Sequence, residues 1–136
     1  MINISKLMSS PLLSINSKSR VLEGVMKMWK NNCSALLVEE NDEYVGIFTK
    51  TDWVDIVRKE VCDPNVIKIS DVMVNPVIKI DKNGTLGEAI NLIEENYIRH
   101  LVVTDKGKVV GMFSVKDLEH YFCQLHDQEG IVKYKF

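Results

Sequence analysis

The sequence predicts an α/β (α+β) fold built from two β-α-β-β-α repeats. Three observations predict it: an internal repeat, apolar residues at helical spacing in each copy, and two apolar strands after each of these helices. The repeat is clearest at Gly46 and Gly111, which stand 65 positions apart. Each opens the same motif: Gly, two apolar residues, a hydroxyl residue, two variable residues and Asp. The motif occupies residues 46–52 and 111–117.

The match continues upstream of the motif without a gap. The positions shared by both copies are Met8 and Met73, Pro11 and Pro76, Ile15 and Ile80, Glu23 and Glu88, Asn31 and Asn96, Leu36 and Leu101, Val38 and Val103, and Val45 and Val110. We therefore expect one repeat over 4–62, a second over 66–126, and a C-terminal tail over 127–136.

Each copy begins with a short apolar stretch that ends in Met, over 4–8 or 69–73. A proline then introduces a short strand, over 12–15 or 77–80. Helical periodicity predicts the first helix from Val21, Leu22, Val25, Met28 and Trp29 in copy 1, and from Leu86, Ala89, Ile90 and Ile93 in copy 2.

The ends of these first helices carry recognisable signals. Thr85 and Glu88 resemble a capping box at the start of the second copy's helix. Asn31 and Asn96 are predicted to close the two helices, because Asn tolerates the left-handed conformation of a C-cap.

Two strands follow each helix. The segments 35–38 and 100–104 are nearly continuous apolar runs, which predicts strands buried on both faces. Polar turns over 39–43 and 105–108 lead to returning strands over 44–48 and 109–113. A second helix is predicted over 51–60 or 115–125, directly after the hydroxyl residue of the motif.

Composition excludes several classes of protein. The chain has 136 residues, a net charge of -2, 46% hydrophobic and 26% charged residues, which are the values of an ordinary soluble domain. That charge favours neither nucleic acid nor an anionic membrane, and no apolar run is long enough to span a bilayer. The N-terminus lacks a secretory signal, and Cys33, Cys62 and Cys123 form no CxxC pair, so we expect a cytoplasmic protein without structural zinc.

The repeated motif places its hydroxyl residue, Thr49 or Ser114, where a strand ends and a helix begins. Unpaired N–H groups at a helix N-terminus suit an anion such as phosphate. Asp52 and Asp117 lie in the first turn, where a carboxylate can accept hydrogen bonds from the vicinal hydroxyls of a ribose. Phosphate and ribose together indicate a nucleotide. The alternative is that both pairs are simply N-caps, a stabilising device worth about 1 kcal/mol.

The order, spacing and duplication of these segments resemble a tandem pair of cystathionine β-synthase (CBS) domains, a Bateman module, over roughly residues 4–125. The resemblance is carried by Asp71-Val72-Met73 with Pro76, by the 99–103 strand, and by the motif at 111–117. It implies two repeats packed about a pseudo-twofold axis, with clefts between them that bind AMP, ADP, ATP or another adenosyl compound.

The resemblance also implies a role for each site residue. Asp52 and Asp117 would hold ribose hydroxyls, while Thr49 and Ser114 would contact phosphate. The base and the rest of the cleft would be bordered by Ser10, Pro11, Leu12, Asn75, Pro76, Val77, Ser34, Ala35, Ile98, Arg99 and His100, with Cys33 beside them in copy 1.

The two copies differ in charge. Arg99, His100 and Lys116 form a cationic cluster in copy 2, whereas copy 1 has Ser34, Ala35 and Lys50. We therefore expect the site of Ser114 and Asp117 to prefer the more highly charged phosphate.

Three functions follow as hypotheses. The favoured one is a stand-alone, non-catalytic regulatory sensor that binds an adenosine-containing small molecule, needs no catalytic cofactor or metal, and signals to an unknown effector protein. An enzyme using acids such as Glu94-Glu95 or Asp52 and Asp55, and a ligand-free interaction module, are the alternatives. The resemblance also implies a homodimer through the helices, for which Trp53, Ile56, Val57, Leu118, Tyr121 and Phe122 are candidates, unless they pack within the chain.

Overall fold

The computed structural model describes residues 2–9, 13–60 and 63–129 of the chain. It divides into two compact units that do not coincide with the two sequence repeats. Unit 1 combines Met1–Pro11 with Ile78–Phe136, and unit 2 is Leu12–Val77. The first residues of each repeat have thus exchanged places, because they belong to the unit built mainly from the other repeat.

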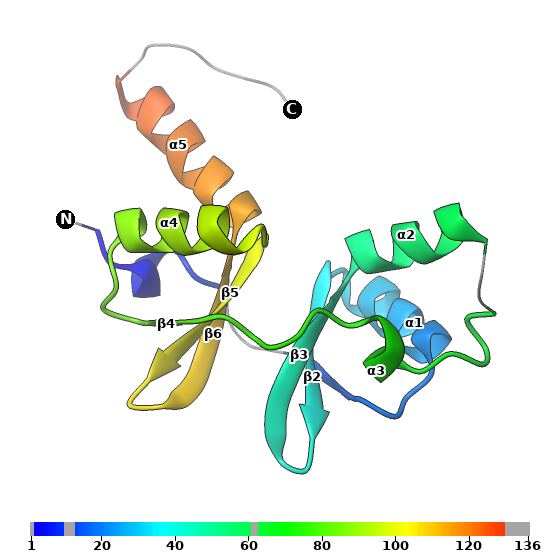
Figure 1. The fold of residues 1–136 in the computed structure, drawn as a ribbon. Helices are drawn as coiled ribbons and strands as arrows, with labels where there is room; N and C mark the ends of the chain where they lie inside the picture. Colours follow the sequence, from blue (N-terminus) through cyan, green and yellow to red (C-terminus); the bar gives the residue numbers. More distant parts are fainter. Residues whose placement is uncertain (1, 10–12, 61–62, 130–136) are drawn as a thin grey trace. The chain divides into compact units, whose positions relative to one another are not determined.

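The described residues of unit 2 form a three-stranded sheet and three helices (Figure 1). Its sheet has the order β1-β2-β3, with β1 parallel to β2 and β2 antiparallel to β3. The elements are β1 Ser14–Asn16, α1 Val21–Asn31, β2 Ala35–Glu40, β3 Glu43–Thr49, α2 Lys50–Lys59 and α3 Ile69–Val72.

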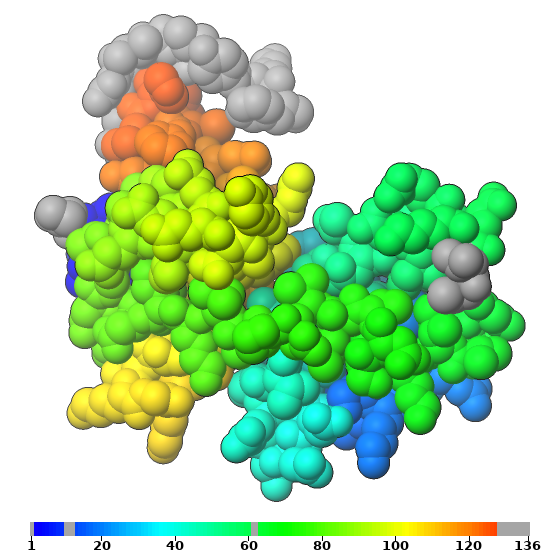
Figure 2. Space-filling view, in the orientation of Figure 1, coloured from blue at the N-terminus to red at the C-terminus, as the bar shows by residue number. Residues whose placement is uncertain are grey.

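Unit 1 repeats this plan with the sheet order β4-β5-β6. Its elements are the 3-10 helix η1 Ile4–Lys6, β4 Lys79–Asp81, α4 Leu86–Asn96, β5 His100–Asp105, β6 Lys108–Ser114 and α5 Val115–Glu129. Even the irregularity in strand pairing recurs at equivalent places, after Val38 in β2 and after Val103 in β5. In each unit the turn of the hairpin is exposed and protrudes at the surface (Figure 2).

The middle strand of each sheet is the centre of the core, as the apolar runs predict. Leu36, Leu37 and Val38 in β2 are fully buried, and so are their equivalents over 101–103 in β5. Strands buried on both faces need apolar side chains at consecutive positions, and this explains why these segments lack alternation.

The exchanged residues, 4–9 in unit 1 and 69–74 in unit 2, are called the lead segments below. Each inserts one fully buried isoleucine into its unit, Ile4 or Ile69. Each also pairs its backbone with the strand that carries the motif. Ile47 and Val74 donate to each other's carbonyl oxygens at 2.9 Å in unit 2, and Ser9 and Met112 do so at 2.8 and 3.1 Å in unit 1.

This pairing explains the glycine that opens each motif. A Cβ on Gly46 would lie 2.7 Å from the Met73 sulfur and 2.9 Å from the carbonyl oxygen of Val74. A Cβ on Gly111 would lie 2.5 Å from the Met8 sulfur. Only glycine allows the lead segment to approach so closely.

The helix C-caps differ from the prediction by one residue. The left-handed residues are Asn32 and Tyr97, with φ of 50° and 53°. Asn31 and Asn96 are instead the last helical residues, and each donates its side-chain amide to a carbonyl oxygen one turn earlier at 2.8 Å. The capping box of Thr85 and Glu88 is present as predicted.

The apolar helix residues divide into exposed positions and positions packed within the chain. Trp29, assigned to the apolar face of its helix, is 76% exposed. Among the dimer candidates, Ile56 is buried, and Trp53 and Leu118 pack against the cores of their own units. Val57 and Phe122 remain exposed, and Tyr121 contacts Phe122 edge to face at 5.8 Å.

Within the described residues, no helix is long and apolar enough to cross a membrane. Cys33 and Cys123 are half-buried free thiols, whereas Cys62 lies outside the described residues. The predicted tail over 127–136 is only partly described. Helix α5 continues to Glu129, and 130–136 lie outside the described residues.

The exchange of lead segments predicts that residue 4 stabilises a unit made mostly of residues 78–136. Replacing Ile4 by Ala should lower the free energy of unfolding by about 2–5 kcal/mol, because it leaves a cavity in the core of unit 1. Urea denaturation measures the change, and Lys6→Ala, an exposed position in the same segment, is the matched control. Equal effects of the two substitutions would show that the segment does not dock there.

Candidate functional site

The motif of unit 2 folds into a closed hydrogen-bonded turn between β3 and α2. Thr49 is the N-cap of α2, and its hydroxyl oxygen accepts from the backbone N–H of Asp52 at 3.3 Å. Asp52 returns the contact through one carboxylate oxygen, Oδ2. That atom accepts from the backbone N–H of Thr49 at 2.8 Å and from its hydroxyl at 3.0 Å.

The motif of unit 1 makes the same three contacts between β6 and α5. The Ser114 hydroxyl accepts from the Asp117 N–H at 3.3 Å. Oδ2 of Asp117 accepts from the Ser114 N–H at 2.9 Å and from its hydroxyl at 3.1 Å. Both motifs are therefore capping devices, and in each carboxylate the capping contacts use Oδ2.

The second carboxylate oxygen distinguishes the two motifs. In unit 1 the hydroxyl of Ser9 donates to Oδ1 of Asp117 at 3.3 Å. Among the residues that the structure describes, no hydrogen bond reaches Oδ1 of Asp52. Ser9 is not among the residues predicted from the sequence, because only the docking of its lead segment brings it to Asp117, 108 positions away.

The first residues of the middle strands lie beside the motifs. Ala35 pairs with Thr49 across the sheet of unit 2, and the Ser34 carbonyl oxygen accepts from the Lys50 N–H at 3.0 Å. In unit 1, His100 pairs with Ser114. The Arg99 carbonyl oxygen accepts from the N–H at the start of α5, also at 3.0 Å.

The remaining predicted residues have mixed outcomes. Asn75, Pro76 and Val77 belong to unit 2 with Thr49 and Asp52, and the Asn75–Pro76 peptide bond is cis. Ile98 is half-buried against the core of unit 1. Ser10, Pro11 and Leu12 lie outside the described residues.

Burial changes the charge predicted for copy 2. Desolvation lowers the pKa of His100 from its ordinary value of 6.5. The negative charge of Asp117 opposes this shift, while the positive charge of Arg99 adds to it. His100 is therefore neutral at pH 7, and the predicted cationic cluster is reduced to Arg99 and Lys116, both with exposed side chains.

Burial also acts on the motif carboxylate of unit 2. Desolvation raises the pKa of Asp52 above its ordinary value of 3.8, although the hydrogen bonds from Thr49 oppose the shift. Repulsion by Asp55 raises it further. An anionic carboxylate held in a partly desolvated position is suited to accept hydrogen bonds from a ligand.

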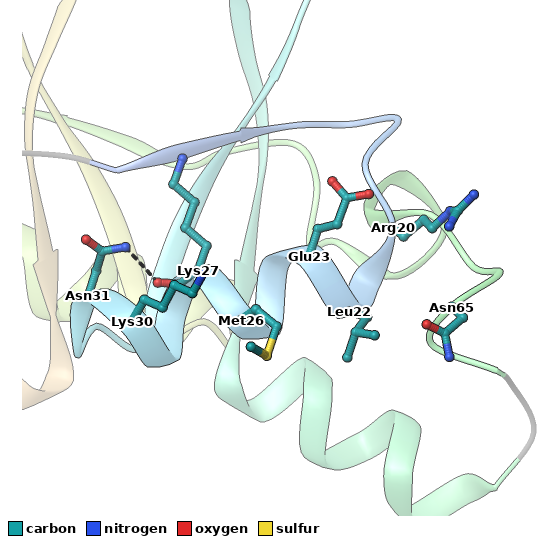
Figure 3. Close-up of a pocket in the computed structure, with 8 residues that line it drawn as sticks. All are labelled: Arg20, Leu22, Glu23, Met26, Lys27, Lys30, Asn31 and Asn65. Atoms are coloured by element: carbon teal, nitrogen blue, oxygen red, sulfur yellow. Dashed lines mark hydrogen bonds between the residues drawn. The ribbon is translucent and has the colours of Figure 1, made fainter.

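A surface pocket of about 490 Å³ lies elsewhere on unit 2, along α1 (Figure 3). Leu22 and Met26 point toward α2, whereas Glu23 and Lys27 point away from it. None of the predicted site residues lines this pocket. In the part of the chain that the structure describes, no group of three or more His, Cys, Asp or Glu residues could hold a metal ion.

The raised pKa of Asp52 predicts a pH dependence of stability. Because the folded state binds the proton more tightly than the unfolded state, Asp52 contributes stability below pH 3.8 that is lost as pH rises through its raised pKa. The stability of the wild type relative to Asp52→Asn should therefore fall as pH rises from below 3.8 through the raised pKa. Urea denaturation at each pH measures this, with Glu43→Gln, which removes an exposed carboxylate elsewhere in unit 2, as the charge-matched control. A difference that stays constant or grows with pH contradicts the prediction.

Two known proteins are similar in sequence to this chain over stretches of different length. The chain is 30% identical to the uncharacterized protein YlbB of Bacillus subtilis over 122 residues, which cover 87% of the chain and 80% of YlbB. It is 34% identical to the uncharacterized protein MK0525 of Methanopyrus kandleri over 86 residues, which cover 62% of the chain and only 44% of MK0525.

Solved structures share the fold. The CBS domain structure NE2398 has a TM-score of 0.79 and 29% identity, and the match covers 90% of the chain and 98% of that structure. The CBS domain protein PAE2072 from Pyrobaculum aerophilum, which was crystallised in complex with AMP, has a TM-score of 0.76 and 23% identity, with coverage of 86% and 90%.

The family model of the CBS domain matches the chain twice, over residues 4–59 and 69–123. Both matches end beyond a motif whose geometry is described above, and together they take in most of the chain. The protein belongs to the CBS domain family and carries a tandem pair of these domains.

Proposed function

We propose that the chain is a non-catalytic regulatory module that binds an adenine nucleotide or another adenosyl compound at its two motifs. The observation that carries the proposal is the duplicated motif turn, in which capping uses Oδ2 of each aspartate and Oδ1 is the oxygen left for a ligand. The AMP complex of PAE2072 supports the choice of ligand class by analogy.

Each residue would have a distinct part in binding. Oδ1 of Asp52 or Asp117 accepts hydrogen bonds from the ribose hydroxyls. The N-terminus of α2 or α5 attracts the phosphate through its positive dipole end. Ser34 and Ala35 in unit 2, or Arg99 and neutral His100 in unit 1, border the ligand, since their backbones pair with the motif turn.

The two motifs still differ in charge when His100 is counted as neutral. Unit 1 offers the exposed side chains of Arg99 and Lys116, whereas unit 2 offers Lys50. Two cations neutralise a di- or triphosphate better than one does. We propose that the motif of unit 1 takes the more highly charged nucleotide.

Ligand binding is expected to raise thermal stability. Protein stripped of bound nucleotide is unfolded with AMP, ADP, ATP or S-adenosylmethionine, each in large excess. A ligand at a hundredfold its dissociation constant stabilises the folded state by roughly 2.7 kcal/mol per site. Each of Asp52→Ala and Asp117→Ala should lose the part of the shift that its own site contributes, measured against its own ligand-free form.

Asp55→Ala is the matched control, because it removes a carboxylate from α2 without touching the motif turn. It should keep the full shift. If none of the four ligands stabilises the wild type, the proposal of a ligand sensor is wrong. A ligand-free interaction module, in which the two motifs only cap helices, then becomes the better explanation.

We also propose that the module signals through protein contacts and assembles as a homodimer through α1 and α2. On unit 2 these helices expose apolar side chains that are not part of its core: Met26, Trp29, Val54 and Val57. The equivalent positions of unit 1 are Asn91, Glu94, Glu119 and Phe122. Exposed aromatic and aliphatic groups that cluster on packed helices are typical of protein interfaces.

Replacing Trp29 by Glu, the residue at the equivalent position of unit 1, should weaken the dimer. An anchoring tryptophan contributes about 2 kcal/mol or more, which corresponds to a roughly 30-fold rise in the dissociation constant. Light scattering over a concentration series measures it. The control Tyr97→Asn removes another exposed aromatic and introduces the residue of the equivalent position 32. A wild type that is monomeric at all concentrations refutes the homodimer.

A further inference from the structure

We propose that Ser9 competes within the chain for the ligand site of Asp117, so that the two motifs bind a ribose with unequal strength. In unit 1 its hydroxyl lies on the carboxylate oxygen that a ribose hydroxyl would use, and in unit 2 no equivalent hydroxyl exists. This inference rests on the proposed function, and it adds a residue that sets the ranking of the two sites.

The contact engages Oδ1, the carboxylate oxygen of Asp117 that capping does not use. Oδ2 already accepts from the N–H and the hydroxyl of Ser114. The Ser9 hydroxyl donates to Oδ1 at 3.3 Å. A ligand hydroxyl that approaches Oδ1 therefore meets a donor already in place.

The Ser9 hydroxyl is positioned by its backbone. Ser9 and Met112 exchange backbone hydrogen bonds at 2.8 and 3.1 Å, and the preceding Met8 packs over Gly111. The side chain itself is exposed and its contact is longer than the usual 2.7–2.8 Å. Rotation about one side-chain bond can thus release Asp117 while the lead segment stays docked.

Unit 2 contains the natural comparison. Val74 stands at the position equivalent to Ser9 and makes the same two backbone hydrogen bonds, with Ile47, at 2.9 Å. Valine has no hydroxyl, so within the described residues Oδ1 of Asp52 receives no such donor. The two backbone hydrogen bonds are the same in both units, whereas the side chain at this position differs.

Exchanging these two side chains tests the proposal by calorimetric titration of the full chain with AMP. In an Asp52→Ala background, which leaves the Asp117 site, Ser9→Val should tighten AMP binding about threefold to tenfold, the equivalent of one modest hydrogen bond. In an Asp117→Ala background, Val74→Ser should weaken it by a similar factor.

Three controls separate competition from a change in packing. Ser9→Thr keeps the hydroxyl and should bind AMP like the parent. Ser9→Val in the Asp117→Ala background should change nothing, because the competing contact and the site it blocks are both absent. In the Asp52→Ala background, 2′,3′-dideoxy-AMP, which lacks the ribose diol, should gain nothing from Ser9→Val.

The outcomes distinguish this inference from the function on which it rests. If AMP binds but Ser9→Val leaves its affinity at the Asp117 site unchanged or weakened, the competition is wrong and the proposed function stands. If ligand-free Ser9→Val leaves the carboxyl carbon NMR signal of Asp117 unmoved, the contact is absent and the competition is equally wrong. If no variant binds AMP, both proposals fail for this nucleotide.

Discussion

The backbone pairing between each lead segment and its motif strand is the contact on which both units depend. It carries Ile4 or Ile69 into a core, and it sets residue 9 or 74 beside a motif turn. It also requires the glycine that opens each motif, because any side chain there would collide with the lead segment. The most recognisable residue of the repeat is therefore explained by packing, and the site inherits its geometry from the same contact.

Capping and ligand binding are compatible uses of one motif. A carboxylate has two oxygens, and the capping box engages Oδ2 in both units. The turn is thereby fixed before any ligand arrives, which reduces the entropy that binding must overcome. The position of Asp52 in this turn also has an unfavourable effect, since burial destabilises the charged form of its carboxylate. A residue that only capped a helix could remain at the surface without that penalty.

The sequence predicted the features that depend on local pattern. The strands over 35–38 and 100–104, the caps at Thr49 and Ser114 and the duplication itself all follow from periodicity and spacing, and the structure confirms them. The exchange of lead segments was not predictable from the sequence. Hydrophobic periodicity predicts a helix or a strand, but not which of the two units a segment packs against. Ser9 was missed for the same reason. His100 was counted as a cation, whereas its burial in three dimensions lowers its pKa and favours the neutral form.

Errors at the helices have a different origin. Trp29 fits the apolar spacing of α1, but an 11-residue helix also has positions at the margin of its apolar face, and Trp29 points to solvent. Asn is the more frequent left-handed residue, yet in α4 it is Tyr97 that adopts this conformation, one position after Asn96. Tertiary packing decides where the helix stops, and residue preference only ranks the candidates.

The exchanged segments also set the order in which the chain can acquire its structure. Unit 2 is one continuous stretch, Leu12–Val77, so a ribosome that has released these residues has released everything that this unit needs. Unit 1 takes its lead segment from upstream of unit 2 and must wait for Ile78 and beyond. Until then Ile4 and Met8 lack the core against which they pack, so the apolar lead segment is exposed to water. During synthesis the vulnerable part of the tandem pair is therefore the lead segment of unit 1.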